Sequence, residues 1–496
     1  MYSSYFCASG SISGSKSAPC LRRASRSFFT STLRTGTSSQ MLSALAVPAA
    51  AKDGRASERP ERSVLTTETA LELACANNPS LAAAEARIEQ ARQQIAQARA
   101  DKLPKLYAAL VGAWQGEEGA IPAYQGEPGH SIPIGYALNS FEEAYQAALG
   151  VQWLIFSSGA AENTIAARKM AFRGIQTREV RTGQAVENAV LVSYYNLQRA
   201  RAKLGVAEEV LALSKEHLSQ VRNFFKYGVV AQDEVLRVEV DVSNGELNVI
   251  SAKNAVDVRW RALERAVGTE LRSKFDLPEP NRNAAPKDAP QWDEASLYAL
   301  RPELKALDFS RRAALAVAAA AQGSSGPKIV AGGEAFAQGR DFWPDGLDTW
   351  KLSLSLRWDF YDGGKARAQV KEYKARAQEL LAQIEDVKRQ VALEVSSAQL
   401  NFESARQRID VASRQVASAK EDYRMALLRY KSNVGTNLDV LDARTALTNA
   451  RTQLVDAVYD MNSSRADLDY ALGLSERFKL PDGVSFAAEG RHGAKK

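Results

Sequence analysis

The sequence predicts a mainly α-helical chain that also contains four β-strands of a membrane β-barrel. Three observations carry this prediction: an internal repeat, long helices with a coiled-coil period, and a strand in which apolar and polar residues alternate strictly. No apolar stretch approaches the roughly 20 residues that a membrane-spanning helix needs. Any membrane crossing would therefore have to use strands.

Residues 1–51 have the composition of a leader segment. They contain no acid and five basic residues, so removing them lowers the net charge from +6 to 6 − 5 = +1. A short apolar run, 41–47, precedes a proline and three alanines, which resembles a small-residue cleavage site. We interpret 1–51 as a processed export signal. An organellar transit peptide, or a start codon placed too far upstream, would explain the same residues. Without the leader, the charge does not predict nucleic-acid binding.

The remainder of the chain contains the same pattern twice. Each half has two prolines 25 residues apart (104 − 79 = 25; 327 − 302 = 25). Each half also has a tryptophan 115 residues before a glycine (268 − 153 = 115; 473 − 358 = 115). We predict a tandem duplication, with a first repeat at 52–276, a Pro-rich linker at 277–290, a second repeat at 291–476 and a C-terminal tail at 477–496.

Each repeat is expected to run helix, strand, loop, strand, long helix, tight turn, helix. In the first repeat these are a helix at about Thr67–Asp101, hairpin strands 105–115 and 145–156, a long helix 159–226 and a helix 232–267. In the second, after an opening helix, they are hairpin strands 328–338 and 351–361, a long helix 363–430 and a helix 437–472.

The second long helix has a coiled-coil period. From Val370 to Tyr430 its apolar residues take seventeen steps, and (430 − 370)/17 is close to 3.5, the period of a left-handed supercoil. Its 68 proline-free residues, 363–430, would span about 100 Å at about 1.5 Å per residue. That is too long for a compact core. Heptads by themselves are nevertheless typical of a solvated coiled-coil rod, so another feature must distinguish such a rod from a membrane protein.

The strand before this helix is that feature. One side carries Lys, Ser, Ser, Arg and Asp, while the other carries only apolar residues: Leu352, Leu354, Leu356, Trp358 and Phe360. Alternate residues face opposite sides of a strand, so this pattern suits lipid outside and water inside. A half-buried soluble sheet is the alternative. Because even small closed barrels use about eight strands, four strands would need partner chains to close.

The segment Val-Gly-Thr-Asn-Leu-Asp-Val-Leu-Asp-Ala at 434–443, with Ala-Leu-Gly at 471–473, resembles the TolC-like outer-membrane efflux family over roughly residues 64–480. The resemblance implies a homotrimer with a 12-stranded barrel in the lipid of the bacterial outer membrane (3 × 4 = 12) and a long periplasmic helical barrel. It implies a passive duct of a tripartite efflux or type I secretion system. Its partners would be a periplasmic adaptor (membrane fusion) protein and an inner-membrane pump or ABC transporter.

The resemblance implies that Asp439 and Asp442 form a ring of carboxylates at a periplasmic gate. It also places Tyr430 and Asn437 at this gate. Asn437 lies near the position of a gating arginine in some relatives. The i, i+3 spacing places both carboxylates on one helix face, where crowded like charges would attract cations. Without the resemblance, they are ordinary helix-start acids favoured by the macrodipole. The resemblance also implies an adaptor-side tip formed by Tyr227, Asp233, Glu234, Val434 and Gly435.

The competing hypothesis for the whole chain is a non-channel coiled-coil scaffold protein that is targeted to an organelle. The histidines at 130, 217 and 492 show no metal-ligand spacing, and no phosphate-binding glycine loop or nucleophile elbow stands out. The sequence therefore predicts neither an enzyme nor a metal or cofactor site.

Overall fold

The structure is a computed structural model that describes residues 63–114, 143–278, 292–339, 342, 349–475 and 477–480. The predicted leader, most of the linker and most of the C-terminal tail lie outside these residues. Within the described residues, no helix has the length and apolar character needed to cross a membrane.

The elements follow the same order in both halves of the chain. The first half contains β1 (Ser63–Val64), α1 (Thr67–Asn77), α2 (Pro79–Ala100), β2 (Lys105–Trp114), β3 (Glu143–Phe156), α3 (Ala160–Lys226), α4 (Gln232–Val267) and β4 (Phe275–Asp276). The second contains α5 (Glu294–Leu300), α6 (Pro302–Ser324), β5 (Lys328–Gly339), β6 (Thr349–Arg357), α7 (Lys365–Lys431) and α8 (Asn437–Leu472). The long helices share one offset (365 − 160 = 205; 437 − 232 = 205), as a duplication would leave them.

The single first helix expected at about Thr67–Asp101 is divided into α1 and α2. Asn78 adopts an extended conformation (φ −70°, ψ 121°), because the following proline disfavours the helical one. Its Oδ1 accepts a hydrogen bond of 2.8 Å from the Ser80 backbone N–H, which caps α2. In the second half, Arg301 precedes Pro302 in the same extended conformation and separates α5 from α6.

The chain forms two compact units, and each unit draws on both repeats. Among the described residues, unit 1 contains Ser63–Glu85, Val180–Leu300 and Ala392–Leu480, while unit 2 contains Ala86–Glu179 and Arg301–Val391. The long helices α3 and α7 contribute residues to both units. The two sequence repeats are therefore not two separate compact domains.

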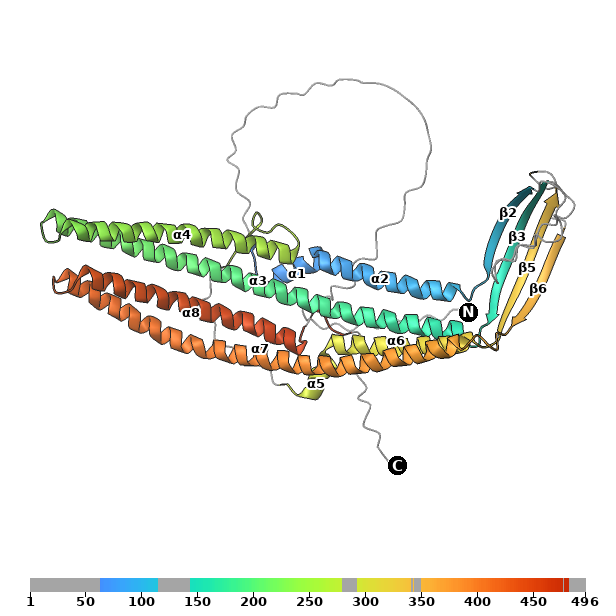
Figure 1. The fold of residues 1–496 in the computed structure, drawn as a ribbon. Helices are drawn as coiled ribbons and strands as arrows, with labels where there is room; N and C mark the ends of the chain where they lie inside the picture. Colours follow the sequence, from blue (N-terminus) through green and yellow to red (C-terminus); the bar gives the residue numbers. More distant parts are fainter. Residues whose placement is uncertain are drawn as a thin grey trace, which may run out of the picture. The chain divides into compact units, whose positions relative to one another are not determined.

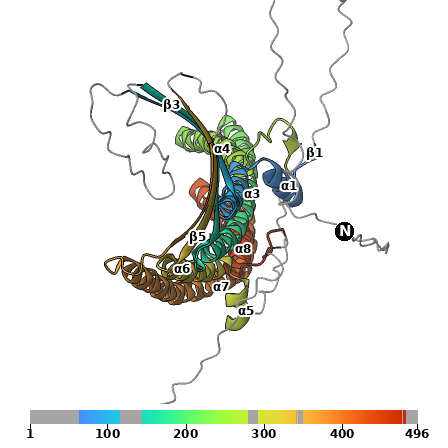
Figure 2. The same cartoon turned by 90° about the vertical axis from the view of Figure 1, so that its right-hand side faces the viewer.

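Unit 2 contains one antiparallel sheet in the order β2-β3-β5-β6. Figure 1 shows the four strands side by side, and Figure 2 shows that the sheet is curved. The central β3–β5 pairing joins the hairpins of the two repeats, with Gly150 opposite Glu334, and a bulge interrupts it between Leu154 and Phe156.

The expected strand 351–361 is wrong at both ends. β6 begins at Thr349 and ends at Arg357, so Trp358 and Phe360 lie outside it. Arg357 pairs with Lys328, the first residue of β5, and the preceding Pro327 has no N–H with which to extend the ladder. The Trp358 indole N–H instead donates to the Ser325 carbonyl oxygen at 3.2 Å. Phe360 is exposed in the connection to α7.

Helices α2, α3, α6 and α7 pack as neighbours in unit 2. Arg87 of α2 pairs with the buried Glu179 of α3 at 3.4 Å. Gly174 of α3 faces α6, where an added Cβ would lie 3.4 Å from the Ala306 carbonyl oxygen. Ala314 of α6 packs against α7 in a small apolar cluster. Small residues thus let these helices approach closely.

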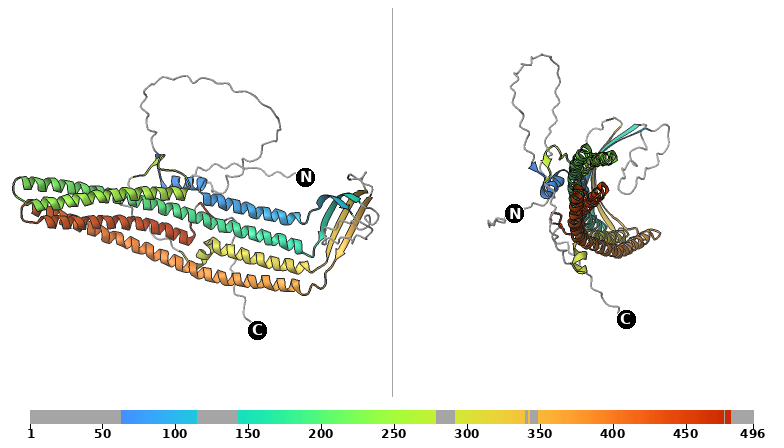
Figure 3. Two further views of the ribbon diagram at one scale, coloured as in Figure 1. Left: turned by 45° about the horizontal axis from the view of Figure 1, so that its top comes forward. Right: turned by 90° about the vertical axis from the view of Figure 1, so that its left-hand side faces the viewer.

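Unit 1 contains two helical hairpins, α3–α4 and α7–α8, both visible in Figure 3. Buried apolar residues of α3 and α4 share one cluster, which includes Leu197 and Leu263. A second cluster joins α3 to α8 through Val206 and Tyr459. Helix α3 therefore packs against both α4 and α8 in unit 1.

Candidate functional site

Two tight turns close the hairpins of unit 1 in matching ways. The Val229 N–H donates to the Phe224 carbonyl oxygen at 2.8 Å, and the Val434 N–H donates to that of Arg429 at 2.9 Å. In each turn the N–H donates to a carbonyl oxygen five residues earlier in the chain, as in common C-terminal helix caps. An apolar cluster ties both turns together through these buried residues: Val221, Val235, Val238, Ala426, Tyr430, Val440 and Ala443. We call this end of unit 1 the tip.

The two candidate gate carboxylates differ in their surroundings. Asp439 belongs to a capping box: Thr436 N–H donates to its Oδ2 at 2.9 Å, and Asp439 N–H donates to Thr436 Oγ1 at 3.2 Å. The hydrogen bond from the Thr436 backbone, followed by that from its side chain, holds the pKa of Asp439 below its ordinary value. Asp442 is exposed, and no described residue makes a hydrogen bond or ion pair with it.

Tyr430 and Asn437 are buried inside the tip. The Tyr430 hydroxyl donates to Glu234 Oε2 at 3.2 Å, which ties α7 to α4. Burial, with the nearby Glu234 carboxylate, raises the pKa of Tyr430. Its ring meets the His217 ring edge-on, with centroids 5.3 Å apart. In this structure, both candidates act first as packing contacts between helices.

The five candidate adaptor-side residues fall into two groups. Tyr227 and Val434 are 78% and 80% exposed, and Asp233, also exposed, pairs loosely with Arg237 at 3.8 Å. Glu234 is half-buried against Tyr430, and Gly435 is half-buried against Arg429. Only the first group presents its side chains to solvent.

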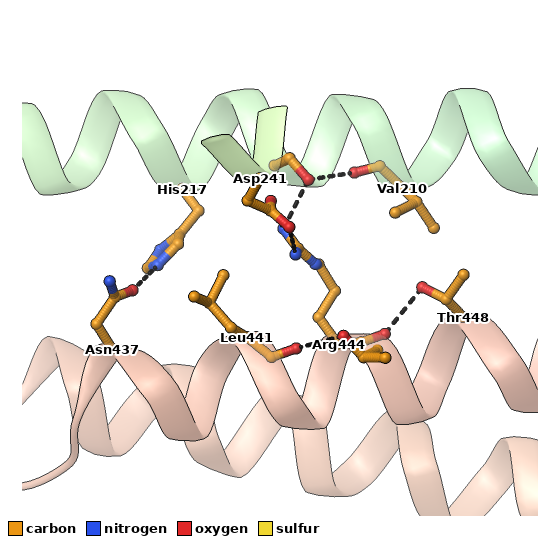
Figure 4. A network of polar contacts seen from close by, with 9 residues as sticks. Val210, His217, Asp241, Asn437, Leu441, Arg444 and Thr448 are labelled. Atoms are coloured by element: carbon orange, nitrogen blue, oxygen red, sulfur yellow. Dashed lines mark hydrogen bonds and ion pairs between the residues drawn. The ribbon is translucent and has the colours of Figure 1, made fainter. Parts of the chain in front are cut away.

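Sequence reasoning missed a buried polar network that Figure 4 shows between α8, α4 and α3. Arg444 is only 5% exposed and forms a two-pronged ion pair with Asp241. It also donates to Ser214 Oγ at 2.6 Å, and Ser214 donates to the Val210 carbonyl oxygen at 3.1 Å. The signal was present in the sequence, because Arg444 interrupts the apolar stripe that includes Leu447.

His217 extends this network toward the start of α8. Its Nε2 lies 2.7 Å from Asn437 Oδ1, and a neutral imidazole donates its Nε2–H to that oxygen. His217 Nδ1 and Asn437 Nδ2 are buried without a hydrogen-bond partner in the described part of the chain. Burial lowers the pKa of His217.

The sheet of unit 2 has one apolar face. Three of the predicted lipid-facing leucines lie within β6, and the register places them on the same face as apolar residues of β2 and β3. These residues are exposed: Leu106, Leu110, Leu149, Trp153, Trp350, Leu352, Leu354 and Leu356. The other face carries the strand lysines, the serines of β6 and Glu334, together with a few apolar residues such as Val330 and Phe336. Charged and polar residues on one face and exposed apolar residues on the other are expected of a sheet between lipid and water.

The sequence model of the family described as outer membrane efflux protein matches residues 70–269 and 296–474. The chain belongs to this family. It is an outer-membrane efflux channel protein with a long periplasmic portion, and the scaffold hypothesis is not favoured.

Relatives and solved structures agree with this assignment. The probable efflux pump outer membrane protein TtgC of Pseudomonas putida is 25% identical over 407 residues, which cover 80% of each chain. The outer membrane protein TolC of Escherichia coli is 25% identical over 57% of this chain and 60% of its own. The outer membrane channel CmeC of Campylobacter jejuni matches the fold with a TM-score of 0.71 at 19% identity, over 89% of this chain and 95% of its own.

Proposed function

We propose that three copies of this chain close a 12-stranded barrel (3 × 4 = 12) and act as a passive exit duct. The observation that carries the proposal is the open four-stranded sheet with one apolar face. Within the described residues, its edge strands, β2 and β6, leave backbone groups unpaired, and each such group costs several kcal/mol in lipid. Neighbouring copies would pair these edges, and lipid would cover the apolar face.

Exposed apolar side chains on α4 and α7 support the same assembly. Helix α4 exposes five large apolar residues on its surface: Leu236, Val240, Leu247, Ile250 and Val258. Helix α7 exposes Leu393, Leu400 and Val411. Contact between copies would bury both sets.

The tip would be the gate, and Asp442 its principal charged group. The exposed Asp442 would repeat around the axis of a trimer and attract cations there. Asp439 would contribute charge while remaining engaged in its capping box. Tyr430 and Asn437 would hold the closed arrangement from inside, because they tie α7 and α8 to α4 and α3.

A periplasmic adaptor would dock on the exposed residues of the tip, including Tyr227 and Val434. An inner-membrane pump or ABC transporter would supply the energy. The names of the relatives, efflux pump outer membrane proteins, favour a tripartite efflux system. Type I secretion uses the same kind of duct and stays the second candidate.

Native mass spectrometry of the detergent-extracted protein, followed by planar-bilayer recording of the same sample, tests the duct. The proposal expects a trimer that opens stable pores. A folded monomer, or a folded oligomer that never conducts, would contradict it.

A further inference from the structure

The polar face of the sheet in unit 2 carries an uneven distribution of charge. The register places these charged residues of the four strands on this face: Lys105, Lys328, Glu334, Lys351 and Arg357. Four are cations and one is a carboxylate. We propose that this face is an anion-attracting wall of the duct, whose charge is set by Lys328 and Lys351.

This inference rests on the proposed function, because the face lines a water-filled lumen only when several copies close the barrel. The solutes that it would favour carry carboxylate, phosphate or sulfonate groups. The acidic gate at the tip would favour the opposite sign, so the wall is a second element of charge selection.

Lys328 and Arg357 stand directly opposite each other in the β5–β6 ladder. Like charges at such positions repel and destabilise a sheet. Arg357 is partly compensated, since its Nε donates to Asp359 Oδ1 at 3.1 Å. No described residue makes a hydrogen bond or ion pair with Lys328. An anionic solute beside it would relieve the repulsion.

The one carboxylate of the wall is already engaged. Glu334 lies opposite Lys351 in the register, and the Tyr107 hydroxyl donates to its Oε1 at 3.3 Å. The Tyr107 ring lies over Gly150 so closely that an added Cβ there would come within 2.3 Å of it. Tyr107 therefore holds Glu334 in place.

A positive charge remains when the described acids beside these cations are counted. Asp101 pairs with Lys105 at 3.0 Å, and Asp359 pairs with Arg357. Together with Glu334 these make three carboxylates against four cations, 4 − 3 = +1 per chain. Lys328 and Lys351 are the two cations of the wall that form no ion pair with a described residue.

Salt screening sets the conditions under which the wall acts. Its charges reach about 8 Å into the lumen at 0.15 M salt, but about 30 Å at 0.01 M. The effect on permeation should therefore be largest at low salt and should fade in molar salt.

The test is the reversal potential of single channels of the assembled trimer in a dilute KCl gradient. Lys328→Gln/Lys351→Gln should lower the chloride-to-potassium permeability ratio roughly twofold at low salt and little at 1 M. Glu334→Gln should raise the ratio. Lys274→Gln, which removes an exposed lysine in unit 1, is the matched control and should leave it unchanged.

A reversal potential of the double lysine variant that equals that of wild type at low salt would overturn the inference, as would an equal shift in the Lys274→Gln control. If Glu334→Gln fails to assemble, the lysine variant still decides. Pores with unchanged selectivity contradict only the charged wall, whereas folded trimers without pores contradict the proposed duct.

Discussion

The two hairpins that form the tip have equal helices but different ends. Helices α4 and α8 are both 36 residues long, and α3 and α7 are both 67. At the start of α4, Ala231 provides no side-chain cap, whereas Thr436 and Asp439 form a capping box at the start of α8. By the 205-residue offset, the buried Arg444 of α8 corresponds to Glu239 of α4, which pairs with Arg222 near the surface. The second hairpin thus carries specific polar contacts that the first lacks.

This difference suggests that the two hairpin ends have different roles in the tip. The α7–α8 end is held by its cap, by Asn437 and by Arg444, and it presents Asp442 to solvent. The α3–α4 end supplies partners for those contacts but has no equivalent of its own network. Changes at the two ends should therefore have unequal effects.

The largest effect is expected from Arg444→Met. The side chains of Arg444 and Asp241 are 7% and 23% exposed, so the change leaves a largely buried carboxylate unpaired. Losing one partner of a buried pair costs about 3 kcal/mol or more. We expect a clear fall in the thermal midpoint and faster amide hydrogen exchange in α8.

Arg451→Met is the matched control on the same helix. Arg451 pairs with Glu209 at 2.8 Å, and that carboxylate is 45% exposed, so its loss should cost below about 1 kcal/mol. Equal destabilisation by the two variants would show that the buried network is not special.

An effect of intermediate size is expected from the two helix caps, where one substitution should destabilise a helix start and the other should stabilise one. Thr436→Ala should destabilise α8 by about 1 kcal/mol, because it removes the hydroxyl that accepts the Asp439 N–H. Ala231→Ser should stabilise the start of α4 by a smaller amount. Hydrogen exchange in the first turn of each helix measures both. Unchanged exchange in Thr436→Ala would mean that the cap contributes nothing.

The smallest effect concerns pH. Burial holds the pKa of His217 below its ordinary value, as does the charge of Arg444, while Asp241 and Glu234 act in the opposite direction. The unfolded chain therefore takes up a proton near pH 6.5 before the folded tip does, and stability falls as the pH drops below that value. The thermal midpoint of wild type should fall more between pH 7.5 and 5.5 than that of His217→Gln. A larger fall in the variant would contradict this.

Local signals predicted much of the fold. Helix α8 has the expected bounds because a threonine cap and a left-handed glycine, Gly473, mark its ends. Strict alternation predicted which residues of β6 share a face, although the end of the strand depends on where β5 begins.

The site was harder to predict because its contacts are distant in sequence. Arg444 and Asp241 are 203 residues apart, and nothing local in either helix identifies the other as its partner. The burial of Tyr430 likewise follows from how four helices meet, and not from its own segment.

The measurement that tests the account most directly is Mg²⁺ block of single channels of the purified trimer, comparing Asp442→Asn with Asp439→Asn. If Asp442 is the free carboxylate of the gate, its removal should weaken the block roughly tenfold, a difference of about 1.4 kcal/mol. Asp439→Asn should weaken it less, because that carboxylate is engaged by Thr436. Equal block in wild type and Asp442→Asn would contradict the gate, and folded trimers that form no pore would contradict the duct itself.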